Sequence, residues 1–118
     1  MQIDPPIQVL ATARFENDLR LLKKRYRNIL TDVQPVVKQL QMGDLPGDQV
    51  AGVGYPIFKV RIRNRDAQRG KSGGYRLLYY LKSVQTITLI TIYSKSDQGD
   101  IAITEIQDIL IEFNQIAI

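Results

Sequence analysis

The chain has 118 residues, of which 44% are hydrophobic and 24% charged, and its formal net charge is +4. These values fit one globular domain over residues 1–118 and exclude a disordered chain, and the lack of an apolar run near 18 residues excludes a transmembrane helix. Cysteine and histidine are both absent, which excludes disulfides and thiolate metal sites and removes the usual neutral-pH base and the usual zinc ligand. Residues 1–6 lack the basic-then-apolar pattern of a signal peptide, and together these features favour the cytoplasm. We expect no metal and no cofactor.

The first predicted elements are a short strand and a helix. Residues 7–11 are mostly apolar and follow two prolines, which predicts a strand at the edge of a sheet or one that joins the sheet late. Thr12 is a suitable N-cap for a helix that begins directly after it. The apolar stripe of this helix consists of Phe15, Leu19, Leu22 and Tyr26.

A second helix is predicted to begin near Thr31 or Asp32. This start places Pro35 in the first turn, where a missing backbone N–H is tolerated. Gly43 is a natural C-terminal stop, so the two helices are expected to form a hairpin. The segment 43–56 contains four glycines and two prolines, which predicts a long irregular loop.

Three strand patterns follow this loop. Residues 57–63 alternate between apolar and basic side chains, as a strand with two different faces does. The apolar face consists of Phe58, Val60 and Ile62, and the basic face of Lys59, Arg61 and Arg63. Residues 74–81 and 86–93 are apolar on both faces, which is typical of central strands, and a polar connection spans 64–73.

The last predicted element is a helix with Ser96 or Asp100 as its N-cap. Its apolar stripe consists of Ala102, Ile106, Ile109, Leu110 and Phe113. The predicted order is therefore β-α-α-β-β-β-α. This is an α+β fold in which a small antiparallel sheet carries an N-terminal helical hairpin on one face.

Positive charge is concentrated between Lys59 and Arg76, where the chain has seven basic side chains and one acidic side chain. Alternate residues of a strand lie about 6 to 7 Å apart, so the basic face of 57–63 can follow the phosphates of a nucleic-acid single strand. Arg76 can add its charge to the same surface. The candidates for RNA binding are Arg63, Arg65, Arg69 and Lys71. Those on the connection could instead be simply solvated.

RNA cleavage without metal or histidine requires attack by the 2′-hydroxyl, stabilisation of the phosphorane and protonation of the leaving 5′-oxygen. Arginine and lysine supply charge, and a tyrosine or lysine whose pKa is lowered by neighbouring cations can move protons. The Tyr93 hydroxyl is expected at the rim of the basic surface, whereas Tyr75 and Tyr79 are expected to pack in the core. The candidate catalytic set is Lys59, Arg61, Arg76, Tyr93 and Lys95.

Three segments, 58–61, 70–80 and 91–96, resemble RelE/HigB-type toxins of bacterial toxin–antitoxin systems. The resemblance covers nearly all of the chain, and the predicted order of elements is similar to the RelE/ParE fold. It implies an mRNA endoribonuclease that acts on the ribosome and is inhibited by a small antitoxin, expected to be a helix-turn-helix protein encoded beside it. It also implies a metal-free cut that leaves a cyclic phosphate on one product.

The resemblance places Lys59 and Arg61 at the paired basic positions of the first motif strand, and Arg76 at the arginine of the Ser-Gly-Tyr-Arg element. The chain departs from the family near its C-terminus, where a late arginine and a tyrosine are missing. Tyr93 and Lys95 are the candidate replacements. The ParE branch of the same fold inhibits gyrase instead, and a non-catalytic RNA-binding module and an inactive toxin are further alternatives.

Overall fold

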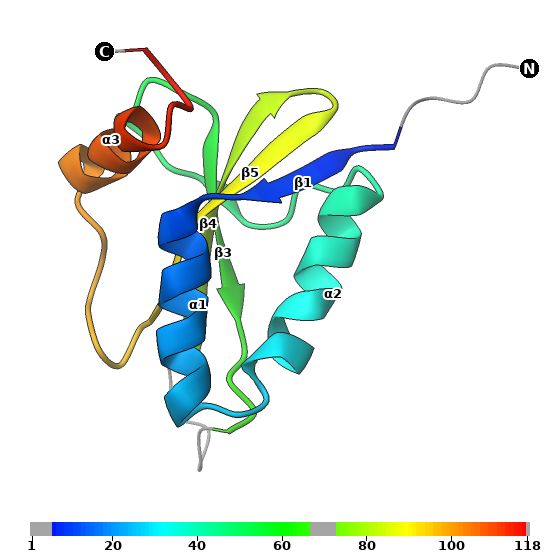
Figure 1. Ribbon diagram of the computed structural model, residues 1–118, viewed down its shortest axis with the longest axis vertical. Coiled ribbons are helices and arrows are strands. Elements are labelled where there is room, and N and C mark those ends of the chain that lie inside the picture. Colours follow the sequence, from blue (N-terminus) through cyan, green and yellow to red (C-terminus); the bar gives the residue numbers. More distant parts are fainter. Residues whose placement is uncertain (1–5, 67–72, 118) are drawn as a thin grey trace, which may run out of the picture.

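The computed structural model describes residues 6–66 and 73–117, which form an α+β fold of five strands and three helices. The elements are β1 (Gln8–Ala11), α1 (Ala13–Arg25), α2 (Ile29–Gln41), β2 (Asp48–Gln49), β3 (Ile57–Ile62), β4 (Tyr75–Ser83), β5 (Thr86–Ser94) and α3 (Ile103–Glu112). Figure 1 shows α1 and α2 as neighbours, with α3 apart from them beyond the sheet.

The sheet has the strand order β1-β5-β4-β3-β2 and is mixed. As predicted, β1 lies at an edge and β4 and β5 lie inside the sheet. However, β1 runs parallel to β5, so the prediction of an antiparallel sheet is wrong at this edge. Most of the chain separates these two strands, so no hairpin forces them to be antiparallel. The short strand β2 lies inside the predicted loop and extends the order to β-α-α-β-β-β-β-α.

The two N-terminal helices are present, with one boundary displaced. Thr12 caps α1 as predicted, because its hydroxyl accepts a hydrogen bond from the Phe15 N–H at 3.0 Å. However, α2 begins at Ile29, earlier than predicted, so Pro35 lies inside the helix and not in its first turn. Ile29 is completely buried. Burial of this side chain stabilises the early start, whereas Pro35 costs one backbone hydrogen bond.

The prediction that Ser96 or Asp100 caps the last helix is wrong. Ala102 occupies the N-cap position of α3 and provides no capping side chain. The first turn of α3 instead forms an ion pair with α1, in which Arg14 Nη2 lies 2.8 Å from Glu105 Oε2. No helix within residues 6–66 and 73–117 is both long and apolar enough to cross a membrane.

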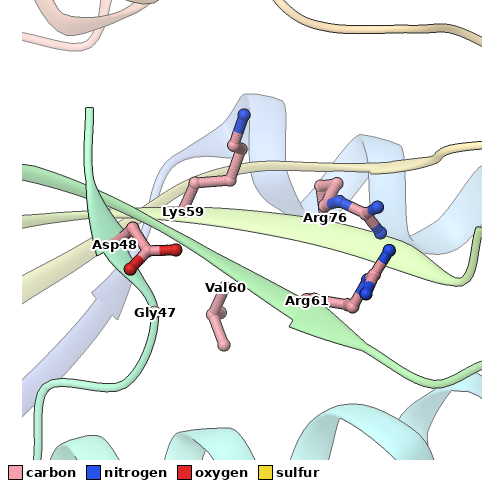
Figure 2. A pocket seen from close by; sticks show the side chains of 6 residues that line it. All are labelled: Gly47, Asp48, Lys59, Val60, Arg61 and Arg76. Carbon is pink, nitrogen blue, oxygen red and sulfur yellow. The ribbon is translucent and has the colours of Figure 1, made fainter. Parts of the chain in front are cut away.

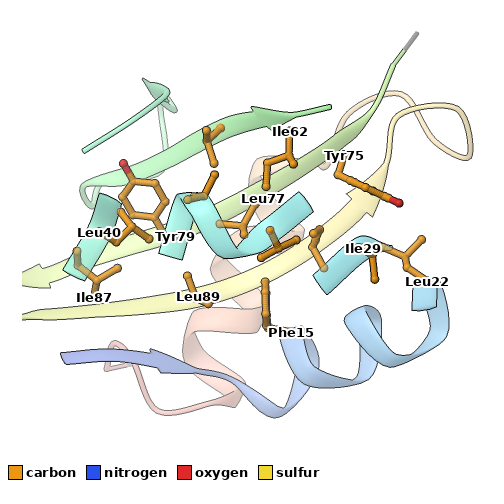
Figure 3. Close-up of a cluster of buried hydrophobic side chains, with 14 residues drawn as sticks. Phe15, Leu22, Ile29, Leu40, Ile62, Tyr75, Leu77, Tyr79, Ile87 and Leu89 are labelled. Atoms are coloured by element: carbon orange, nitrogen blue, oxygen red, sulfur yellow. The ribbon is translucent and has the colours of Figure 1, made fainter. Parts of the chain in front are cut away.

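Apolar side chains form a separate cluster on each face of the sheet. The first cluster lies between the sheet and α1 with α2, and it includes Tyr75 and Tyr79, both fully buried as predicted (Figure 3). The second cluster lies between the sheet and α3 and includes Leu78, Tyr80 and Ile106. The sheet is therefore the middle layer of three.

Candidate anion-binding site

Three basic side chains share the sheet face on which α3 packs. Lys59 and Arg61 lie on this face of β3, and Arg61 is directly opposite Arg76 of β4. Figure 2 shows the two guanidinium groups pointing toward one another, with Lys59 on the same side of the sheet and Val60 on the other. An open pocket of about 440 Å³ is lined by Gly47, Asp48, Lys59, Val60, Arg61 and Arg76. The structure thus brings three of the predicted catalytic residues together.

The Arg61–Arg76 pair places two positive charges side by side. Side chains directly opposite on antiparallel strands have Cβ atoms about 4.5–5.5 Å apart, and like charges at this distance repel. The Arg76 guanidinium donates through Nη1 to the carbonyl oxygens of Gly73 and Tyr75, and the residue is buried, so its position is fixed. Arg61 is exposed. Together they present a set of N–H donors suited to a phosphate group.

Lys59 and Lys95 converge on one carboxylate. The Asp100 Oδ1 atom lies 3.3 Å from Lys59 Nζ and 3.4 Å from Lys95 Nζ. Lys95 Nζ also donates to the Gly99 carbonyl oxygen at 2.6 Å. Hydrogen bonds from Lys59 first and Lys95 second hold the pKa of Asp100 below its usual value. Lys95 therefore joins the predicted site, but through an acidic residue that the sequence pattern places at a helix cap.

Asp48 is a pocket residue that the sequence pattern does not single out. The short strand β2 places it opposite Lys59 of β3. The preceding Gly47 has a φ of +90°, and a side chain there would collide with the Lys59 carbonyl oxygen. This glycine is the available signal, because glycine often marks a close approach between two backbones. The exposed Asp48 carboxylate can accept a proton at the edge of the pocket.

Tyr93 lies opposite Arg76 on β5, but its hydroxyl is not at the rim of the basic surface as predicted. The side chain packs under α3 and is 6% exposed, and its buried hydroxyl makes no well-directed hydrogen bond within the described residues. Burial raises the pKa of Tyr93, and Asp100 adds to the rise, while Arg76 and the Ile101 backbone oppose it. The predicted lowering by cations is therefore wrong for this tyrosine, because desolvation outweighs them.

Arg63 and Arg65, the two predicted RNA-binding residues that the structure describes, do not line the pocket. Arg63 is exposed just beyond the end of β3. The Arg65 side chain turns toward α2, where its Nε lies 3.3 Å from Oδ1 of Asp32, whose side chain is only 1% exposed. The Arg65 backbone N–H also donates to Asp32 Oδ2 at 3.1 Å. Arg69 and Lys71 lie outside the described residues. Arg65 thus has a partner in the fold and not in the pocket.

No family model matches the chain, and no curated protein matches it significantly. In the part of the chain that the structure describes, no three His, Cys, Asp or Glu side chains are grouped as a metal ion would require. The basis for a function is therefore the geometry of the pocket: two adjacent guanidinium groups, two lysines on one carboxylate, and a second carboxylate at the edge.

Proposed function

We propose that the chain is a RelE/HigB-type toxin with a RelE/ParE-like fold, an endoribonuclease that cuts mRNA on the ribosome and so inhibits translation. The observation that supports this most directly is the Arg61–Arg76 pair beside Lys59, because it concentrates three cations at an open pocket. One phosphodiester can contact both guanidinium groups, and its negative charge offsets their repulsion. The type of reaction and its dependence on the ribosome are inferred from the motif resemblance.

In the proposed reaction, the 2′-oxygen of the substrate attacks the adjacent phosphorus. An O2′–P bond forms and the P–O5′ bond breaks, which yields a 2′,3′-cyclic phosphate and a 5′-hydroxyl. Arg61 and Arg76 stabilise the charge that develops on the phosphorane, and each such donor is typically worth about 3 kcal/mol in the transition state. The step is a transesterification, so it consumes no water and uses no metal or cofactor.

Two protons have to move in this reaction. Asp48 is the proposed acceptor of the 2′-hydroxyl proton, because its carboxylate is exposed at the edge of the pocket. Lys59 is the proposed donor to the leaving 5′-oxygen, and Lys95 is assigned a phosphate contact beside it. Tyr93 is assigned no proton transfer, because its hydroxyl is buried.

The proposal also includes partners and a location, which rest on the motif resemblance. The macromolecular partners are the mRNA, the ribosome that holds it, and a small helix-turn-helix antitoxin encoded beside the toxin. All three are reached in the cytoplasm of a bacterium. A reading frame for such an antitoxin next to this one is a simple genetic observation that would strengthen the proposal.

Induced expression of the wild type, Arg61→Ala and Lys82→Ala in bacterial cells tests the ribonuclease activity. Arg61 is exposed, so its loss should not disturb folding, and Lys82 is an exposed cation of the same sheet outside the pocket. We expect the wild type and Lys82→Ala to arrest growth and to leave mRNA fragments with 5′-hydroxyl ends. Arg61→Ala should reduce cleavage about 100-fold, the usual effect of losing one transition-state donor.

Arg76→Ala repeats the test at the buried arginine, with circular dichroism to verify that the variant folds. Growth arrest that survives both arginine substitutions without mRNA cleavage would contradict the ribonuclease proposal and would favour the gyrase-inhibiting branch of the fold. A wild type that is harmless on induction would contradict the toxin proposal as a whole.

A further inference from the structure

The segment between β5 and α3, residues 95–102, is tied to the rest of the molecule at two acidic side chains. Asp97 accepts a hydrogen bond from Arg25 of α1, with Oδ2 and Nη1 2.6 Å apart. Three residues later, Asp100 lies between two lysines at the pocket. Both aspartates are exposed. Ion pairs at these two aspartates therefore anchor the segment to α1 and to the pocket.

The Asp100 carboxylate lies between two ammonium groups at the pocket. Its Oδ1 atom contacts the ammonium groups of both Lys59 and Lys95, as one oxygen of a phosphate between two lysines would. The Asp100 side chain is 69% exposed, so it can leave this position without opening the core. Because Lys59 lines the same pocket as the two arginines, the carboxylate neutralises positive charge beside them.

We propose that Asp100 is an internal competitor for the substrate: its carboxylate occupies the Lys59–Lys95 pair in the free protein, and a phosphate must displace it. The inference rests on the proposed function for the identity of that phosphate, which belongs to a single-stranded RNA. After displacement, the ion pair of Asp97 keeps the segment attached to α1. This competition lowers the affinity of the pocket for single small anions. It favours an RNA strand whose phosphates contact the two arginines and the two lysines at the same time.

The test compares Asp100→Asn with the wild type and with Asp97→Asn. Both variants remove one negative charge from the same segment and keep the side-chain size, but Asp97 is paired with Arg25 and not with a pocket residue. Asp97→Asn is therefore the matched control for a general electrostatic effect. The probe is a short fluorescein-labelled oligouridylate with 2′-O-methyl groups, which cannot undergo 2′-hydroxyl attack, and its affinity is measured by fluorescence anisotropy over a range of salt concentrations.

Asp100→Asn should bind this probe about fivefold more tightly than the wild type at low salt, and Asp97→Asn should stay within about twofold of it. When the RNA binds the wild type, the displaced Asp100 carboxylate takes up a sodium ion, and this uptake partly cancels the release of counterions from the RNA. The plot of log affinity against log salt should therefore be steeper for Asp100→Asn, by up to about 0.7. Equal affinities for all three proteins, or weaker binding by Asp100→Asn, would overturn the proposal.

Inorganic pyrophosphate, used as a second probe, separates this inference from the proposed function. If Asp100→Asn gains affinity for pyrophosphate and no protein binds the RNA, the competition stands and the RNA function fails. If the RNA binds but Asp100→Asn changes neither affinity, the function survives and the competition is refuted. If neither probe binds any of the proteins, both ideas are refuted.

Discussion

Replacing Arg65 by methionine tests whether this residue acts in the fold or at the substrate. The substitution keeps most of the aliphatic stem and removes the charge. The side chain of its partner Asp32 is 1% exposed. In the variant, Asp32 Oδ2 would still accept the hydrogen bond from the backbone N–H of residue 65. The Asp32 Oδ1 atom has no well-directed hydrogen bond even now, although Arg65 Nε lies 3.3 Å away. The variant therefore leaves a buried carboxylate whose charge is not compensated.

The expected loss follows from the exposure of the two partners. Removing one partner of a fully buried ion pair costs about 3–5 kcal/mol, whereas an exposed pair contributes about 0–1 kcal/mol. Here the acid is buried, but the Arg65 side chain is 64% exposed, so water screens the pair. We therefore expect Arg65→Met to lower the free energy of unfolding by about 1–2 kcal/mol, which for a domain of this size shifts the Tm by about 4 °C per kcal/mol.

Urea unfolding followed by circular dichroism measures this loss. Arg63→Met is the matched control, because Arg63 is also an exposed arginine and lies two residues earlier. A double-mutant cycle with Asp32→Asn isolates the pair, and we expect a coupling free energy of about 1 kcal/mol. If Arg65→Met has the same urea midpoint as Arg63→Met and loses RNA affinity that Arg63→Met keeps, then the structural role is refuted and Arg65 is a phosphate contact.

Gly47→Ala should lower the free energy of unfolding, measured in urea, by more than about 2 kcal/mol, because the added Cβ would collide with the Lys59 carbonyl oxygen. Gly54 has the same φ but lies in open space, so Gly54→Ala should cost only about 1 kcal/mol. Equal losses for the two variants would contradict the predicted collision. Burial raises the pKa of Tyr79 to about 12, so the stability it contributes is complete below pH 10 and is lost toward pH 12. Raising the pH from 10 to 12 should therefore lower the free energy of unfolding of the wild type more than that of Tyr79→Phe. Thr12→Ala should cost about 1–2 kcal/mol by thermal unfolding, and Thr12→Ser should recover most of it.

Local periodicity is sufficient to predict which side chains share the basic face. The alternation along β3 places Lys59 and Arg61 on the side opposite Val60, and the structure has them there. The position of Arg76 directly opposite Arg61 does not follow from local periodicity. It is a register between two strands, and it depends on how the chain between them is connected, which no local pattern reveals.

The remaining differences from the prediction also arise from contacts between distant parts of the chain. Asp48 lies on a strand of two residues, too short for any period to be detected. Asp100 has the residue type of a helix cap, but it pairs instead with Lys59 of β3 and with Lys95, which directly follows β5. The Tyr93 hydroxyl is covered because α3 packs on that face, and the position of a helix on a sheet is a tertiary property.

The parallel pairing of β1 with β5 has a consequence for the order in which a newly made chain can fold. Gln8–Ala11 is synthesised well before its partner Thr86–Ser94, with most of the described elements between them. Closing such a long loop is slow and comes late in folding. The β3–β4 hairpin, which carries Lys59, Arg61 and Arg76, needs only neighbouring chain and can form earlier. The cationic hairpin is thus expected to exist during translation before the sheet around it is closed.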